Sequence, residues 1–402
     1  MRTFGSTLLT ISLSVGCSST PITLGGEAVD MVGISGAELI DAAYSNVKDI
    51  AGFSVSPIHF ASANFAAGSG PSAIVTADFN GDKNADVAVT NSFDNNVTLL
   101  LGKGDGTLLP PRAFATGRIP MFLAAGMVNG DSSIDLVALA VDDGAASVLL
   151  GNGDGTFRAA TPVIVGASPS GLALADFDHD GKLDIATGDT VNGVIVVLRG
   201  NGDGTFQTAQ TSSVQSTPHS LVAADYDGDG FPDLIVGMMA TATMNSITDD
   251  AAAVFHGRGD GTFGRASVVG GASGPQNVSI ENRGGALQLA RVEVNNGGGV
   301  AQYGIDHAGT LAGIGECFCG SRSVKALLGP LGGGNNLAML NQGDDTVTTF
   351  ISSAGRIEGK NQFSVGHLPI DGVLVDLNGD GAQDIAVANN GSNNVTVLLN
   401  QP

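Results

Sequence analysis

The sequence predicts an all-β protein that repeats one unit of about 49 residues. The first observation is an aspartate-rich loop, DFDHDGKLD from Asp176 to Asp184, whose copies begin at 78, 127, 176 and 225, each 49 residues from the next. The second is that the apolar runs between the loops are short, and the third is that 60 of the 402 residues are glycine. Short strands joined by glycine turns at this period are typical of four-stranded sheets rather than of helical repeats.

One complete unit divides into four expected strands. Around the central loop, a strand of small residues covers 172–176, a second covers 183–187, and a third, rich in valine, covers 194–198. A glycine turn then leads to the fourth strand. The turn is a second signature, because Gly-Asp-Gly-Thr recurs at 104–107, 153–156, 202–205 and 259–262. Three copies are followed by a phenylalanine that we expect to anchor the outer strand: Phe157, Phe206 and Phe263.

The pattern loosens after Asp233. Residues 238–252 read as an exposed loop inserted between two strands. The fifth unit begins near Glu281 and the sixth runs through Leu327 to Leu340, and neither keeps the series of aspartates. We therefore expect two sheets that retain the fold without a metal loop.

The last unit predicts how the array closes. It regains the motif at Asp376 and stops after the strand from Val395 to Asn400, one strand short of a full unit. The missing outer strand is expected at the other end of the array, in Phe60–Ala67. Seven units joined in this way predict a seven-bladed β-propeller with four-stranded antiparallel blades over residues 57–402, because closure removes exposed sheet edges.

The alternating aspartates predict calcium sites. Carboxylates crowded at positions 1, 3, 5 and 9 of a short loop repel one another unless a cation binds them, and Ca²⁺ takes six to eight oxygen ligands, including a backbone carbonyl, here expected at position 7. Glycine at position 6 allows the positive φ of a tight turn. A polar turn between strands is the alternative for a single copy, but recurrence favours a metal.

Four loops carry the expected ligand set. The loop with Lys83 at position 6 is expected to bind more weakly, and the copy in which Met127 replaces the first aspartate, leaving Asn129, Asp131 and Asp135, is expected to bind little or no metal. The expected ligands are Asp176, Asp178, Asp180, Lys182 and Asp184; Asp225, Asp227, Asp229, Phe231 and Asp233; Asp376, Asn378, Asp380, Ala382 and Asp384; and Asp78, Asn80, Asp82, Asn84 and Asp86.

The N-terminal residues predict export. Residues 1–17 read as a signal segment, and the run from Leu13 to Cys17 resembles the lipid-attachment box of bacterial lipoproteins, with Ser14 where that box prefers leucine. Both a lipid anchor at Cys17 and secretion without one remain open. Residues 18–56 are expected to be a linker with one short helix over 36–50, whose start has capping-box spacing.

Composition narrows the class of partner. The formal net charge of −22 argues against nucleic acid and anionic membranes. No apolar run is long enough to span a membrane. Cys317 and Cys319 lack the further ligands of a zinc site, which leaves a local disulfide or two free thiols.

The aspartate loops, each followed by an apolar strand and a turn such as GNGDGTF, resemble the FG-GAP/VCBS-type repeats of bacterial surface proteins, which are related to integrin α-subunit propellers. The resemblance covers residues 57–402, strongly in four units. It implies a propeller with Ca²⁺ between the first and second strands of several blades. Members of the family act in adhesion, in carbohydrate recognition or as accessory domains.

These patterns favour an exported, monomeric, non-enzymatic module that binds an extracellular protein or glycan. The alternatives are a lectin-like propeller, against which the absence of tryptophan argues, and an accessory domain of an extracellular polysaccharide-processing enzyme. Catalysis is not expected, because the aspartates are explained by metal binding and the histidines share no repeated position with a base or nucleophile partner: His59, His179, His219, His256, His307 and His367.

Overall fold

The computed structural model describes residues 10–11, 22–23, 59–214, 217–239, 251–264, 266–271, 275–283, 286–293, 299–305, 311–318, 323–329, 331, 335–353 and 356–401. The chain forms two compact units, Met1–Pro57 and Ile58–Pro402. In the first unit, β1 (Thr10–Ile11) and β2 (Ile22–Thr23) pair antiparallel. The predicted helix over 36–50 and Cys17 lie outside the described residues.

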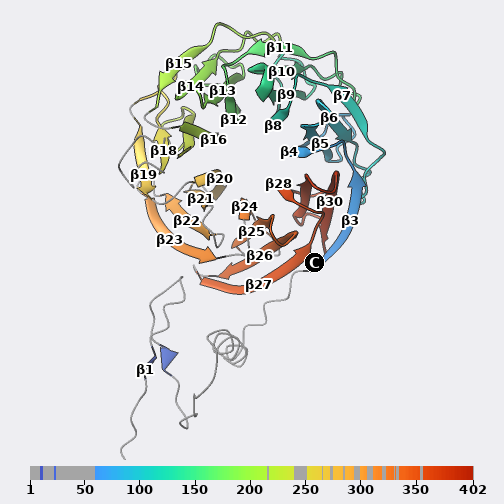
Figure 1. Cartoon of the computed structure of the whole chain (residues 1–402), viewed down its shortest axis with the longest axis vertical. Helices are drawn as coiled ribbons and strands as arrows, with labels where there is room; N and C mark the ends of the chain where they lie inside the picture. Colours follow the sequence, from blue (N-terminus) through green and yellow to red (C-terminus); the bar gives the residue numbers. More distant parts are fainter. Residues whose placement is uncertain are drawn as a thin grey trace, which may run out of the picture. The chain divides into compact units, whose positions relative to one another are not determined.

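The second unit consists, in its described residues, of seven four-stranded antiparallel sheets, which we call blades (Figure 1). Six of the seven blades pair their strands in chain order, as the sequence predicted for one unit. Blade 1 consists of β4 (Pro71–Ala77), β5 (Asp86–Asn91), β6 (Asn96–Leu100) and β7 (Arg112–Ala115). Blade 2 consists of β8 (Pro120–Gly126), β9 (Asp135–Ala140), β10 (Ala145–Leu149) and β11 (Thr161–Ile164), with a 3-10 turn η1 (Val141–Asp143) between β9 and β10. Blade 3 consists of β12 (Pro169–Ala175), β13 (Asp184–Asp189), β14 (Val194–Leu198) and β15 (Gln210–Ser213), and blade 4 of β16 (Thr217–Ala224), β17 (Asp233–Met239), β18 (Ala251–Phe255) and β19 (Ser267–Gly271).

The two units without aspartate loops also form four-stranded blades. Blade 5 consists of β20 (Pro275–Arg283), β21 (Ala286–Glu293), β22 (Gly299–Ile305) and β23 (Leu311–Phe318), and blade 6 of β24 (Ser323–Gly329), β25 (Asn335–Asn341), β26 (Thr346–Ser353) and β27 (Arg356–Ser364). Cys317 lies in β23, and Cys319 falls outside the described residues. No helix in the described residues is both long and apolar enough to span a membrane.

Blade 7 combines the two ends of the repeat array. Its strands are β28 (Pro369–Val375), β29 (Asp384–Asn389), β30 (Asn394–Asn400) and β3 (Phe60–Ala66). Strand β3 pairs antiparallel with β30 from Phe60 opposite Asn400 to Ala66 opposite Asn394. The predicted pairing of the first strand of the array with the last is therefore confirmed.

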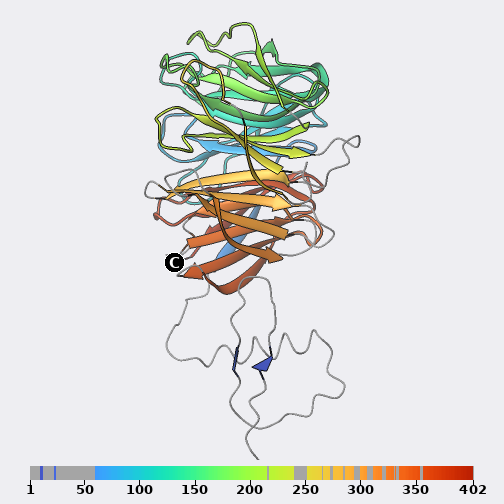
Figure 2. The same cartoon turned by 90° about the vertical axis from the view of Figure 1, so that its left-hand side faces the viewer.

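The innermost strands bring the blades together. Strand β4 contacts β8, and the contacts continue through β12, β16, β20, β24 and β28, which in turn contacts β4 (Figure 2 shows the blades from the side). Near the start of each inner strand the register shifts by one residue. In blade 3 the shift occurs at Gly171, where φ is +64° and a Cβ would lie 2.7 Å from the backbone nitrogen of Leu221 in blade 4. Glycine is required there because no side chain fits between the two strands.

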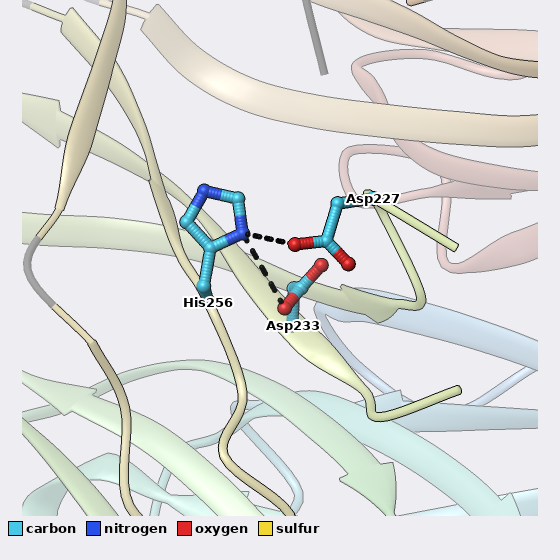
Figure 3. Close-up of side chains that lie close together, drawn as sticks. All are labelled: Asp227, Asp233 and His256. Atoms are coloured by element: carbon cyan, nitrogen blue, oxygen red, sulfur yellow. Dashed lines mark ion pairs between the residues drawn. The ribbon is translucent and has the colours of Figure 1, made fainter. Parts of the chain in front are cut away.

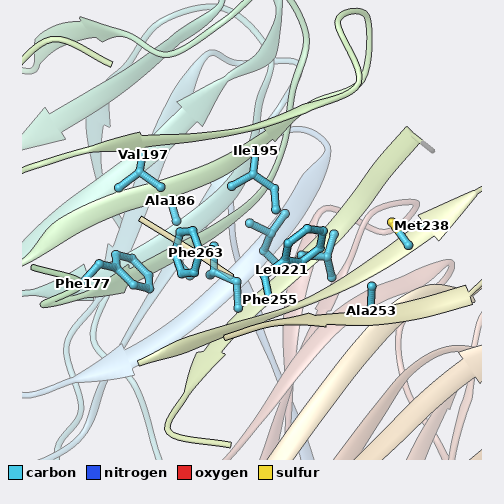
Figure 4. Packing of buried hydrophobic residues seen from close by; sticks show 12 residues of the cluster. Phe177, Ala186, Ile195, Val197, Leu221, Met238, Ala253, Phe255 and Phe263 are labelled. Atoms are coloured by element: carbon cyan, nitrogen blue, oxygen red, sulfur yellow. The ribbon is translucent and has the colours of Figure 1, made fainter. Parts of the chain in front are cut away.

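Most of the hydrophobic core in the described residues lies between neighbouring blades. Because side chains alternate across a strand, Leu136 and Ala138 of β9 pack toward blade 1, whereas Val137 and Leu139 pack toward blade 3. Figure 4 shows the interface of blades 3 and 4, where Ile195 and Val197 belong to the same cluster as Phe255. No blade can bury both faces alone, which is why the fold needs neighbouring repeats.

The predicted insertion is shorter than the sequence indicated. Met238 and Met239 complete β17, Ala251 and Ala252 begin β18, and Met238 pairs with Ala251. The expectation of an exposed loop over all of 238–252 is therefore wrong at both ends, because small and apolar residues extend the hairpin. Residues 240–250 lie outside the described residues.

Candidate metal loops

Five aspartate loops connect the first strand of a blade to the second, as predicted. They belong to blades 1, 2, 3, 4 and 7, and they begin at residues 78, 127, 176, 225 and 376. In each loop the aspartate at position 9 is the first residue of the second strand.

The position-9 aspartate is fully buried in all five loops. One carboxylate oxygen accepts the backbone N–H of loop position 2, and the other accepts the N–H of a residue at or just after the end of the third strand. The donors, at 2.7–2.9 Å, are Phe79 and Gly102 to Asp86, Val128 and Gly151 to Asp135, Phe177 and Gly200 to Asp184, Tyr226 and Gly257 to Asp233, and Leu377 and Asn400 to Asp384. The sequence predicted this residue as a metal ligand, and the structure also gives it a role in joining three segments of each blade.

Burial changes the protonation of these carboxyl groups. Desolvation raises the pKa of Asp86 and of Asp184 to about 6, while the two backbone N–H groups act in the opposite direction. Desolvation likewise raises the pKa of Asp135, Asp233 and Asp384. A cation beside such an oxygen favours the ionised form, so a metal would relieve the cost of burying the charge.

The remaining loop oxygens are held in place by the loop backbone. The position-1 carboxylate accepts the N–H of position 6: Lys83 to Asp78, Gly181 to Asp176, Gly230 to Asp225 and Gly381 to Asp376, at 2.8–3.1 Å. The position-5 carboxylate accepts the N–H of position 7: Asn84 to Asp82, Ser133 to Asp131, Lys182 to Asp180, Phe231 to Asp229 and Ala382 to Asp380, at 2.7–3.0 Å. The oxygens are therefore oriented by the chain itself.

Position 6 has positive φ, as predicted. The angle is +85°, +92° and +84° at Gly181, Gly230 and Gly381, and +71° at Lys83, which carries a side chain in the same strained conformation. The sequence analysis missed that position 4 is also left-handed. His179 occupies it with φ of +59°, and the other four loops have glycine there: Gly81, Gly130, Gly228 and Gly379. That recurring glycine was the available signal.

In the blade 3 loop, Asp176, Asp178 and Asp184 have ligand oxygens within 4.8 Å of one another. Asp178 has a buried Oδ1 without a hydrogen-bond partner in the described residues, which fits a site for a cation. Asp180 was predicted as a ligand but is not part of this group, and its Oδ2 forms an ion pair with Lys182 Nζ at 2.8 Å. Arg199 Nε lies 3.4 Å from Asp178 Oδ2, an ion pair that the sequence analysis did not predict.

In the blade 4 loop the acidic groups form two sets that share Asp227. Asp225, Asp227 and Asp229 form one set, and Asp227, Asp233 and His256 form the other. His256 Nδ1 lies 3.1 Å from Asp227 Oδ2 and 3.8 Å from Asp233 Oδ1, with the three side chains pointing toward one another (Figure 3). The first set was predicted, whereas the histidine was not.

The blade 1 and blade 7 loops have asparagine at position 3. The Asn80 amide donates to Asp82 at 2.9 Å, and the Asn378 amide donates to Asp380 at 2.9 Å. The amide oxygen of each accepts a backbone N–H two residues on. These loops therefore place fewer charged oxygens together than those of blades 3 and 4. In blade 2, Met127 is half exposed and supplies no carboxylate, as read from the sequence.

The glycine turn of one blade lies against the aspartate loop of the blade before it. The second glycine of the turn donates its N–H to the carbonyl of loop position 2: Gly155 to Phe79, Gly204 to Val128, Gly261 to Phe177, and Gly106 of blade 1 to Leu377 of blade 7, at 2.9–3.2 Å. Phe157 and Phe263 pack edge-on against Phe79 and Phe177, with centroids 5.8 and 5.5 Å apart. These phenylalanines therefore join neighbouring blades, a role beyond the outer-strand anchor expected from the sequence.

Arg199 and His256 occupy the same place in their blades. Each follows the third strand and precedes a glycine, Gly200 or Gly257. The corresponding residue is Leu101, Leu150 or Leu399 in blades 1, 2 and 7. Aligning the ends of the third strands, rather than the histidines alone, was the signal that could have found these two residues.

The fold and its loops define a class of all-β repeat proteins in which four-stranded sheets carry acidic loops between their first and second strands. Within that class, residues 78–138, 128–187 and 176–236 match the FG-GAP-like repeat. These segments are therefore FG-GAP-like repeats, which run from the aspartate loop of blade 1 to β17 of blade 4, and the resemblance seen in the sequence is confirmed there. No curated protein matches the chain in sequence.

Solved structures share the fold at low identity. A proposed 6-phosphogluconolactonase from Bacteroides uniformis is 15% identical, with a TM-score of 0.57 over 75% of this chain and 87% of its own. BBS1N, in its complex with ARL6DN, is 10% identical, with a TM-score of 0.57 over 86% of this chain and 97% of its own. A protein from Lactobacillus plantarum is 14% identical, with a TM-score of 0.55 over 76% of this chain and 88% of its own. At these identities the likeness concerns the fold alone.

Proposed function

We propose that this protein is an exported, calcium-stabilised β-propeller that binds an extracellular protein or glycan without catalysis. The observation that carries the proposal is that the loop carboxylates accept hydrogen bonds from backbone N–H groups and lie together in clusters of possible metal ligands. Asp176, Asp178 and Asp184 are the clearest case. Oxygens arranged in this way suit a structural cation rather than proton transfer. Export, through a lipid anchor at Cys17 or by secretion, is tested by mass spectrometry of the mature N-terminus.

We infer that the seven blades form one closed ring. The pairing of β3 with β30 and the hydrogen bond from Gly106 of blade 1 to Leu377 of blade 7 support closure, because they join the beginning of the array to its end. In a closed ring every blade has two neighbours and every face of its core is covered. A ring of this kind is self-sufficient, which favours a monomer.

Calcium is the cation we assign to the loops of blades 3, 4, 7 and 1. Its oxygen ligands would be the carboxylates and amides at positions 1, 3, 5 and 9, together with the carbonyl at position 7. Among these loops, the blade 3 loop is the best candidate for Ca²⁺, because Oδ1 of Asp178 is buried without a hydrogen-bond partner and a hard cation would bind it.

Chelation of calcium is expected to lower the melting temperature. A site saturated at 100 times its Kd contributes about 2.7 kcal/mol, so Tm should fall on addition of EGTA and recover with added Ca²⁺. In calorimetric titration, Asp178→Ala should lose more Ca²⁺ affinity than Asp131→Ala, because the loop of Asp131 already lacks its first ligand at Met127. An unchanged Tm after chelation would exclude a stabilising calcium ion.

We propose that the ligand binds at the edge opposite the metal loops. In an antiparallel blade, the turns between the second and third strands lie at that edge. Phe93, in the turn after β5, is 72% exposed, and Val191, in the turn after β13, is 70% exposed. Exposed apolar side chains at turn tips are suited to ligand contact. Residues 240–250 connect the equivalent strands of blade 4.

Replacing Phe93 by serine is expected to weaken ligand binding at least about tenfold without changing Tm, since a buried aromatic contact contributes roughly 1.5–3 kcal/mol. The ligand is to be found first on a glycan array and a panel of bacterial and host surface proteins, with and without Ca²⁺. The matched control is Met127→Ser, a 50% exposed residue in the blade 2 loop, at the edge of the metal loops. An equal loss of ligand binding in both variants would contradict a binding site at the edge opposite the metal loops. Turnover of a polysaccharide, phosphoester or peptide would overturn the non-enzymatic assignment.

A further inference from the structure

We propose that blade 4 holds a divalent transition metal of the zinc class through Asp227, Asp233 and His256. These side chains come from the aspartate loop, the start of β17 and the residue after β18 (Figure 3). The site is distinct from the oxygen-only loops of the other blades. In blade 4 this metal would take Asp227 and Asp233 in place of the calcium ion proposed for that loop, and the inference does not depend on calcium binding in the other blades.

The separations of the ligand atoms fit a small cation. Nδ1 of His256 is 3.1 Å from Asp227 Oδ2 and 3.8 Å from Asp233 Oδ1, and all three ligand atoms lie within 4.8 Å of one another. Ligands bound tetrahedrally at roughly 2.0–2.1 Å from zinc are separated by about 3.3 Å. Only small side-chain rotations are needed to bring the three atoms around one ion.

Nδ1 of His256 is buried and has no hydrogen-bond partner among the described residues. Its 3.1 Å approach to Asp227 lacks the geometry of a hydrogen bond, and the side chain as a whole is 33% exposed. A metal ion bound between this nitrogen and the two carboxylates would satisfy the nitrogen's lone pair.

Neighbouring groups already orient the two carboxylates. Asp233 is fully buried and accepts the N–H groups of Tyr226 and Gly257, each at 2.7 Å, which leaves a second lone pair on each oxygen for a metal. Asp227 uses Oδ1 to accept the N–H of Asp229 at 3.2 Å, and Oδ2 faces His256. Hydrogen bonds of this kind from outside the ligand set position metal-binding carboxylates.

The donor set determines the class of metal. Calcium and magnesium take oxygen ligands almost exclusively, whereas an imidazole with two carboxylates suits zinc, cobalt or nickel. Three protein ligands leave a coordination position, and Asp227 is 32% exposed, so water or a ligand group can reach it. The position that His256 occupies is leucine in blades 1, 2 and 7 and arginine in blade 3, which explains why only this blade gathers the set among the described residues.

The test measures Zn²⁺ and Co²⁺ binding to the full chain by equilibrium dialysis and by Co²⁺ absorption, in millimolar Ca²⁺. We expect His256→Leu, which introduces the leucine found at this position in three other blades, to lose one equivalent of bound Zn²⁺. The fall in Zn²⁺ affinity should exceed the roughly 10–100-fold that follows the loss of a residue that only hydrogen-bonds to a metal ligand. His179→Asn, which removes a histidine from the blade 3 loop where φ is positive, should retain the equivalent. Tm of the metal-free variants checks that each is folded.

Two further variants separate this site from the calcium loops. Asp176→Asn removes a charge from the blade 3 loop, which shares no residue with this site, and should weaken Ca²⁺ binding while leaving Zn²⁺ binding unchanged. Arg199→His places an imidazole beside Asp178 and Asp184 and should add a second equivalent of Zn²⁺. Absence of Zn²⁺ binding by the unaltered protein, or equal Zn²⁺ binding by it and by His256→Leu, would overturn the proposal whether or not calcium binds.

Discussion

Asp135→Ala is expected to destabilise the fold by about 2–6 kcal/mol, although its loop lacks the first metal ligand. Asp135 is fully buried, and its two oxygens accept the N–H groups of Val128 and Gly151. Each buried donor left without a partner costs about 1–3 kcal/mol, and the substitution leaves two. The free energy of unfolding, measured by urea denaturation in EGTA, gives the effect without any contribution from metal.

Two other variants make this result interpretable. Asp135→Asn keeps the side-chain volume and one acceptor oxygen, so about half of the loss is expected. Asp131→Ala removes an exposed carboxylate of the same loop, which accepts a hydrogen bond from the N–H of Ser133. It should change the free energy of unfolding by less than about 1 kcal/mol. If Asp135→Ala and Asp131→Ala had equal effects, the position-9 aspartate would not be the structural link we assign.

Deleting residues 57–67 is expected to abolish cooperative unfolding and to cause aggregation. The deletion removes β3, which pairs with β30 along seven residues from Phe60 to Ala66. Strand β30 then presents a free edge in which Val395, Val397 and Leu398 are buried in the intact protein. An unpaired apolar edge of this kind is a template for pairing with other chains.

The control for that deletion lies outside the repeat array. Removal of residues 1–33, which belong to the other compact unit, should leave Tm and the monomeric state unchanged. Light scattering and thermal unfolding followed by circular dichroism distinguish the two deletions. A folded, monomeric protein lacking 57–67 would show that blade 7 is stable with three strands and that the ring needs no closure.

Periodicity alone predicted most of the architecture. The 49-residue spacing, the glycine turns and the aspartate loops located the first three strands of blade 3 to within a few residues, and the incomplete last unit predicted the partner of Phe60–Ala66. The repeat made this possible because each blade is a local structure in which neighbouring strands pair in chain order. Where the repeat broke, at 238–252, the predicted loop was too long.

The amino-acid pattern was sufficient to identify a repeat protein with acidic loops at a fixed place in its units, because spacing within nine residues is enough to specify such a loop. The surroundings of each loop depend on contacts between distant segments, which the pattern does not reveal. Arg199 approaches Asp178, and His256 approaches Asp227, from the far end of a third strand. The buried link of Asp135 and the contact of Phe157 with Phe79 likewise join segments distant in the chain. These distances are set by strand pairing and by the packing of one blade on the next. The residues of a single loop carry no information about either.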